Sequence, residues 1–100
     1  MSVPSSVYKF AELLVRFITS SRGRPAAFRP NNYMQVDSDV VMLIYELSAR
    51  GYISKTRNSK GVRVTVPPDS PLYKMVLSAC SDVPTQTCVK QVAEYLHKFI

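Results

Sequence analysis

The chain contains no tryptophan, one histidine and only two cysteines. His97, Cys80 and Cys88 are too few ligands for a four-coordinate structural zinc site, and there is no CxxC pair. Two cysteines are also too few for the disulfide framework of a small secreted scaffold. They either form one bridge, if two helix ends meet, or pack separately as small apolar side chains. For a reducing cytosol we favour the separate thiols.

Long apolar runs and catalytic motifs are also missing. No stretch reaches the roughly 20 apolar residues of a membrane-spanning helix, and the first residues do not open a signal-peptide pattern. There is no glycine-rich phosphate loop, no nucleophile elbow and no metal-ligand spacing. We therefore expect a protein that is not an enzyme and has no cofactor, metal, small-molecule substrate or membrane partner. Its expected location is the cytoplasm, the nucleoid or, in a eukaryote, the nucleus.

Acidic residues are scarce, and their distribution is uneven. Seven Asp and Glu stand against thirteen Lys and Arg, which gives a net charge of +6. Both flanks, 1–15 and 64–100, are neutral, so the whole excess lies in 16–63, with nine basic residues and three acids. A basic middle between neutral flanks favours a surface that binds a polyanion, foremost nucleic acid, over charge that only solvates the chain.

One hundred residues with 46% hydrophobic content suffice for one core and are too few for two. We therefore expect a single domain over 1–100. Apolar residues at spacings of three and four indicate helices, alternation indicates strands, and prolines and glycines delimit both. The pattern predicts helices at 5–20, 31–35, 38–50, 71–79 and 85–99, and strands at 52–56 and 62–66.

The helix at 38–50 is expected to run directly into a hairpin with a basic tip. Asp37 or Ser38 can cap the helix, and Arg50-Gly51 ends it. Its inward-facing residues are predicted to be Val40, Val41, Leu43, Ile44 and Leu47. The turn at 57–61 contains Asn58 and Gly61, which both accept positive φ. The hairpin has no acid among its four cations, Lys55, Arg57, Lys60 and Arg63.

This segment, VDSDVVMLIYELSARGYISKTRNSKGVRVTV, resembles the recognition helix and wing of winged-helix transcription regulators. The shared pattern is a polar cap, a helix of leucine-type positions, an arginine-glycine end and an apolar-polar strand. The resemblance implies an α+β, mainly helical fold: a winged helix-turn-helix with one β-hairpin wing (about 52–66) and a C-terminal helical extension (about 70–100). It also implies double-stranded DNA as the partner, bound by a transcription regulator or a chromatin-type architectural protein.

In such domains the third helix lies in the major groove and reads base edges with its outward-facing residues. The corresponding positions here are Ser38, Asp39, Met42, Tyr45, Glu46 and Ala49. This face departs from the family pattern, since it has two acids and no Lys or Arg before Arg50. We therefore expect DNA contacts mainly from the four wing cations, which can reach phosphates or a minor groove. The alternative for these charges is protection of an exposed strand edge.

A second basic cluster precedes the helix-turn-helix. The string Arg22-Gly23-Arg24-Pro25 resembles the core of the AT-hook, which lays an extended backbone in the minor groove of A·T-rich DNA. The alternative is an ordinary basic loop that contacts phosphates. Arg29 and Ser38 are further candidates, as are the amides of Asn31 and Asn32, which suit adenine edges but also form turns and caps.

The first and last helices carry more apolar positions than a small monomer needs. This favours a homodimer through the N- and C-terminal helices.

Two other functions compete with DNA binding. The main rival is a protein–protein interaction module, with a docking face that holds Asp39, Met42, Tyr45 and Glu46. The third function is RNA or single-strand binding, with unpaired bases stacked on Tyr33, Tyr45 and Tyr52.

Overall fold

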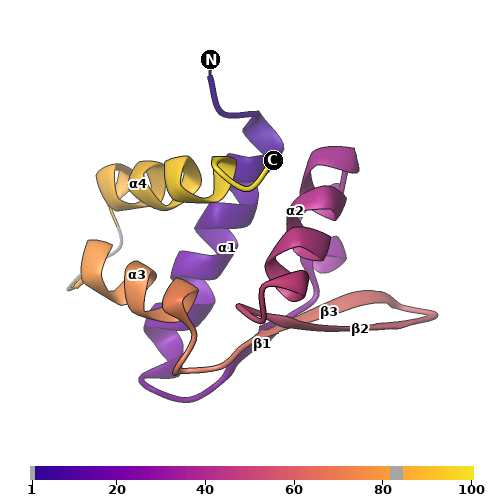
Figure 1. Cartoon of the computed structure of the whole chain (residues 1–100), viewed down its shortest axis with the longest axis horizontal. Coiled ribbons are helices and arrows are strands. Elements are labelled where there is room, and N and C mark those ends of the chain that lie inside the picture. The colour runs from indigo at the N-terminus through magenta and orange to yellow at the C-terminus, as the bar shows by residue number, and fades with distance from the viewer. Residues whose placement is uncertain (1, 82–84) are drawn as a thin grey trace.

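The structure is a computed structural model that describes residues 2–81 and 85–100. Over these residues it is an α+β domain with four α-helices, one short 3-10 helix and a three-stranded antiparallel sheet. In chain order the elements are α1 (Ser5–Ser21), β1 (Ala26–Phe28), η1 (Pro30–Asn32), α2 (Ser38–Ala49), β2 (Ser54–Asn58), β3 (Gly61–Val66), α3 (Pro71–Ala79) and α4 (Gln86–His97). Figure 1 shows α1 between α2 and the pair α3 and α4, with the β2–β3 hairpin projecting away from the helices. None of the helices in the described ranges has the length and apolar character needed to cross a bilayer.

Helix α1 is the centre of the hydrophobic core. Its buried residues recur at helical spacing and are Val7, Phe10, Ala11, Leu13, Leu14, Val15 and Ile18. Helix α4 packs along α1 and buries its own apolar face there. The apolar positions that suggest a homodimer are therefore covered within one chain, and the dimer itself stays a prediction.

The sheet has the strand order β1-β3-β2, with β3 in the middle. Strand β2 pairs with β3 along the hairpin, while β1 pairs only with the last part of β3, from Val64 to Val66. The sequence pattern does not predict β1, because it is three residues long and alanine is a weak strand former. It forms because Ala26 and Phe28 are buried against the core. Strand β1 thereby ties the base of the hairpin to the helical body.

The predicted helices at 5–20, 38–50, 71–79 and 85–99 are confirmed to within two residues at each end. The helix predicted at 31–35 is instead the 3-10 turn η1. Its carbonyl acceptor is Pro30, which receives bonds of 3.0 Å from the amides of both Tyr33 and Met34. Two asparagines in the turn compete with continued helix, because their side chains favour turns and caps.

One residue of α2 faces differently from the prediction. Val40, Leu43, Ile44 and Leu47 are buried as expected, but Val41 is 41% exposed. Successive residues of a helix are turned by about 100°, so Val41 lies at the edge of the face that Val40 places in the core. The prediction that Val41 points inward is therefore wrong.

Cys80 and Cys88 form a disulfide between the end of α3 and the first turn of α4. Their Cα atoms lie 5.4 Å apart, within the span of a bridge. The preference for two separate thiols is therefore wrong. Burial alone does not distinguish the two states, since both side chains are buried. The deciding feature is that the two helix ends meet, which sequence patterns do not reveal.

Candidate functional site

The β2–β3 hairpin ends in a tighter turn than the sequence suggests. Asn58 pairs with Gly61, so only Ser59 and Lys60 form the tip. Asn58 shapes the turn through its side chain, whose Oδ1 accepts a hydrogen bond of 2.8 Å from the Lys60 amide. Of the two residues able to take positive φ, Gly61 does so, at 109°, and Asn58 does not. The Lys60 side chain is exposed at the end of this turn.

A close approach at Gly61 joins the hairpin to η1. A Cβ at position 61 would lie 2.7 Å from Oδ1 of Asn31, inside any normal contact distance. Glycine is favoured here mainly by its backbone conformation, because the exposed Asn31 side chain can move aside for a Cβ. This contact places η1 beside the base of the tip.

The four hairpin cations do not share one face. Residues directly opposite each other in an antiparallel pair lie on the same face. Lys55 is opposite the buried Val64, and Arg57 is opposite the half-buried Val62, so both cations lie on the face that turns toward the protein body. Arg63 is opposite Thr56 and is exposed on the other face.

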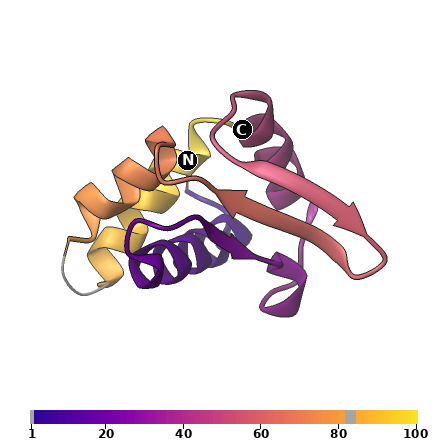
Figure 2. The ribbon, with the colours of Figure 1, turned by 90° about the horizontal axis from the view of Figure 1, so that it is seen from below.

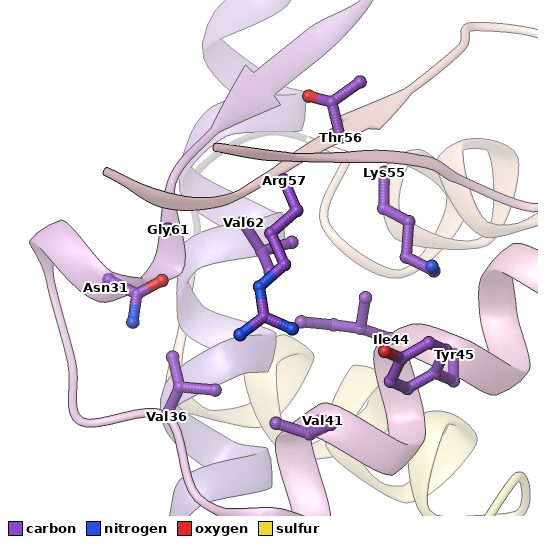
Figure 3. Close-up of a pocket in the computed structure, with 10 residues that line it drawn as sticks. All are labelled: Asn31, Val36, Val41, Ile44, Tyr45, Lys55, Thr56, Arg57, Gly61 and Val62. Atoms are coloured by element: carbon purple, nitrogen blue, oxygen red, sulfur yellow. The ribbon is translucent and has the colours of Figure 1, made fainter. Parts of the chain in front are cut away.

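A groove separates the inner face of the hairpin from α2. It has a volume of about 260 Å³. Its lining residues come from η1, α2, the hairpin and the segment between η1 and α2, and they are Asn31, Val36, Val41, Ile44, Tyr45, Lys55, Thr56, Arg57, Gly61 and Val62. Figure 3 shows the Arg57 guanidinium reaching down from β2 into this space, toward Val36 and Val41.

The hairpin cations have no acidic partners in the part of the chain that the structure describes. The ion pair found there joins Arg50 and Glu46, four residues apart on α2, at 3.5 Å. Lys55 instead lies over an aromatic ring, with its Nζ 4.3 Å from the ring centroid of Tyr45. Such a contact leaves the positive charge uncompensated. The hairpin therefore presents unneutralised positive charge.

The Arg22-Gly23-Arg24-Pro25 segment is a tight turn that is fastened to the core. Arg22 and Gly23 both have positive φ, at 49° and 83°, and the Arg24 amide donates to the Ser21 carbonyl at 3.1 Å. The buried Tyr73 of α3 holds this turn, because its hydroxyl accepts from the Gly23 amide and donates to the Arg24 carbonyl. This folded backbone favours the basic-loop interpretation over the extended AT-hook. The arginine side chains are exposed.

The two basic clusters lie at opposite ends of the sheet. Ala26, which directly follows the basic loop, pairs with Val66 at the end of β3 farthest from the tip. Six strand residues span about 17 Å, and Lys60 lies beyond the other end. Figures 1 and 2 show the loop after α1 at one end of the molecule and the hairpin tip at the other. Arg22 and Arg24 thus do not join the hairpin cations in one patch.

The other predicted contact residues lie near the hairpin. Arg29 directly follows β1, whose Phe28 pairs with Val64, so Arg29 lies at the level of Arg63. It is half-buried, and its Nε is enclosed with no hydrogen-bond partner in residues 2–81 and 85–100. Asn31 and Asn32 are both exposed in η1, beside the hairpin.

Ser38 begins α2 and is exposed, while Asp37 provides the cap. The Asp37 carboxylate accepts a hydrogen bond of 3.0 Å from the Val40 amide. The nearby Ser6 side chain and the hydrogen bond from the Val40 amide favour its charged form and hold the pKa of Asp37 below its ordinary value. The capping assignment for Asp37 is therefore confirmed, and Ser38 is left free to contact a partner.

The outward face of α2 is apolar and weakly acidic. Met42 and Tyr45 are 58% and 54% exposed, as predicted, and Val41 adds to them. Tyr33, after η1, is a further large exposed side chain at 47%. Glu46 is partly neutralised by Arg50, which leaves Asp39 as the other acid of this face. The groove beside this face was not foreseen, because its walls come from segments far apart in the sequence.

Comparison with protein-family models, with curated proteins and with solved structures finds no match to this chain. The functional interpretation therefore depends on the geometry and charge of the described residues.

Proposed function

We propose that this chain is a winged-helix protein that binds double-stranded DNA, with the β2–β3 hairpin as its wing. The order α1, η1, α2 and hairpin is compatible with that layout, although η1 is a single turn where a helix is expected. The resemblance of residues 36–66 to a recognition helix and wing supports the same assignment. Binding is non-covalent, and the protein acts as a transcription regulator or a chromatin-type architectural protein.

The observation that carries the proposal is the unneutralised charge of the projecting hairpin. Its four cations have no carboxylate partner among the described residues, and all four side chains are exposed. Each cation that neutralises a phosphate releases bound counterions, which drives association. Arg29, Asn31 and Asn32 lie beside the hairpin and extend this surface with polar contacts.

The hairpin cations differ in the part of a DNA molecule that each can contact. Lys60 at the tip and Arg63 on the outer face are free to reach a phosphate or a minor groove. Lys55 and Arg57 face α2, so they would contact a backbone that passes between helix and wing. Arg22 and Arg24 lie too far along the sheet to share that contact. They would bind a separate DNA segment, and a homodimer would present two wings.

A second function is favoured by one specific observation, the exposed apolar face of α2. Met42, Tyr45 and Val41 present large apolar side chains outward, and contiguous exposed apolar surface marks interaction sites. Under this alternative the chain is a protein-interaction module that docks its partner on α2. The hairpin charges would then be incidental.

A mobility-shift series over salt concentration tests the first proposal. Each phosphate contact contributes about 0.9 to the slope of log affinity against log salt, so Lys60→Gln/Arg63→Gln should flatten the slope by about 2. The matched control is Lys74→Gln/Lys90→Gln, which removes the same charge from exposed positions of α3 and α4. Equal slopes for the two double variants would contradict the assignment of the wing.

The probes and one further variant separate the alternatives. Preference for A·T-rich over G·C-rich duplex, lost on Arg24→Gln, would support groove contact by the basic loop. Stronger binding of single strands than of duplex would favour the RNA or single-strand function. If Met42→Ser/Tyr45→Ser leaves DNA affinity unchanged and abolishes the capture of a protein partner, the second function is favoured.

A further inference from the structure

The groove between α2 and the hairpin has two features that DNA binding does not require. Its walls are largely apolar, formed by Val36, Val41, Ile44 and Val62. Its two cations converge from one side, because Lys55 and Arg57 both project from the inner face of β2. An apolar pocket with a few convergent charged groups is the usual form of a small-ligand site.

The cations in the groove are available to a ligand. The guanidinium of Arg57 points into the space and has no carboxylate partner in the described ranges. Lys55 lies over the Tyr45 ring, which positions the ammonium at the rim without neutralising it. Among the residues that the structure describes, no acid lines the groove. These features suit an anion that is apolar on its other side.

We propose that this groove binds a small amphipathic monoanion, such as an aromatic or short-chain carboxylate. The carboxylate would pair with the planar Arg57 fork, which matches its geometry. The apolar part would lie against Val41 and Val62, with Tyr45 at the rim. The volume of about 260 Å³ is below the range of about 300–1,000 Å³ for drug-sized ligands. A single ring or a short acyl chain therefore fits.

The test is calorimetric titration of the full chain with three probes, namely benzoate, benzamide and inorganic phosphate. Benzoate is expected to bind saturably with one site per chain. Benzamide has the same ring without the charge, and phosphate has charge without an apolar part, so both should bind at least tenfold more weakly. Equal binding of benzamide, or of phosphate, would overturn the amphipathic assignment.

Two variants of the same hairpin provide a matched pair. Arg57→Gln removes the charged partner from the groove and should weaken benzoate binding about ten- to a hundredfold, the range expected for one charged hydrogen bond. Arg63→Gln removes the same charge from the outer face and should leave the affinity unchanged. Equal effects of the two variants would show a general charge effect and refute the site.

The apolar wall has its own variant and an independent readout. Val62→Thr keeps the β-branched shape but makes the wall polar. It should therefore weaken the binding of benzoate and leave the binding of phosphate unchanged. In wild-type protein, benzoate should shift the amide resonances of residues 41–45 and 55–57 in NMR spectra. Shifts confined to other residues would refute the site. These measurements contain no DNA, so the site and the proposed DNA binding can fail separately.

Discussion

Reduction of the disulfide between Cys80 and Cys88 is expected to lower the stability of the folded chain considerably. The two cysteines are separated by eight positions, so the bridge closes a short loop of the unfolded chain. Loop-closure entropy for that length corresponds to about 2.5 kcal/mol at 25 °C. The free energy of unfolding of such domains is only about 5–15 kcal/mol, so the bridge would supply a large share of the stability.

The assay is thermal unfolding followed by circular dichroism, with and without a phosphine reductant. A loss of about 2.5 kcal/mol corresponds to a fall of roughly 10–20 °C in the melting temperature of a domain of this length. The control is Cys80→Ala/Cys88→Ala, whose unfolding should not respond to the reductant. An unchanged wild-type melting temperature, after thiol titration has confirmed two free thiols, would contradict a stabilising role of the bridge.

Two further predictions concern a fastened turn and a helix cap. Tyr73→Phe removes the hydroxyl that accepts from the Gly23 amide at 3.1 Å and donates to the Arg24 carbonyl at 2.7 Å. We expect the unfolding free energy from urea titration to fall by about 1–3 kcal/mol, and no change would mean that water replaces both bonds. The pKa of Asp37 is lower in the folded chain than its ordinary value of 3.8. The ionised carboxylate therefore stabilises the folded chain above pH 3.8, and this stabilisation is lost as the pH falls through the lower folded-state pKa. The melting temperature of Asp37→Asn should therefore approach that of wild type in acid, and a gap independent of pH would contradict this role.

Much of the helical framework could be predicted from the sequence. The long helices have apolar residues at regular spacing, and Asp37 and Gly51 mark the start and end of α2 as expected. Strand β1 could not be predicted, because its three residues carry no alternation and its partner lies almost forty residues away. The disulfide was missed for a related reason, since it depends on where two helix ends lie in space.

The sequence predicts which residues belong to the candidate site, but not how they are arranged in space. The hairpin cations and the exposure of Met42 and Tyr45 follow from local periodicity. Their grouping depends on register. Because Arg57 pairs with Val62, the Arg57 side chain turns toward α2. Because Ala26 pairs with Val66, the basic loop lies at the far end of the sheet. Composition shows that charge is concentrated in 16–63, but only strand pairing shows that it forms separate clusters.

The position of β3 in the middle of the sheet has a consequence for the order of folding. Strands β1 and β2 both precede β3 in the chain, and neither pairs with the other. During synthesis the two strands have no partner until β3 has left the ribosome, and the face of α1 that packs against α4 stays uncovered until α4 follows. Contacts between distant segments slow folding. The nascent chain therefore carries two unpaired strands until β3 emerges and an uncovered face of α1 until α4 emerges, and a chaperone would be most useful to it in that period.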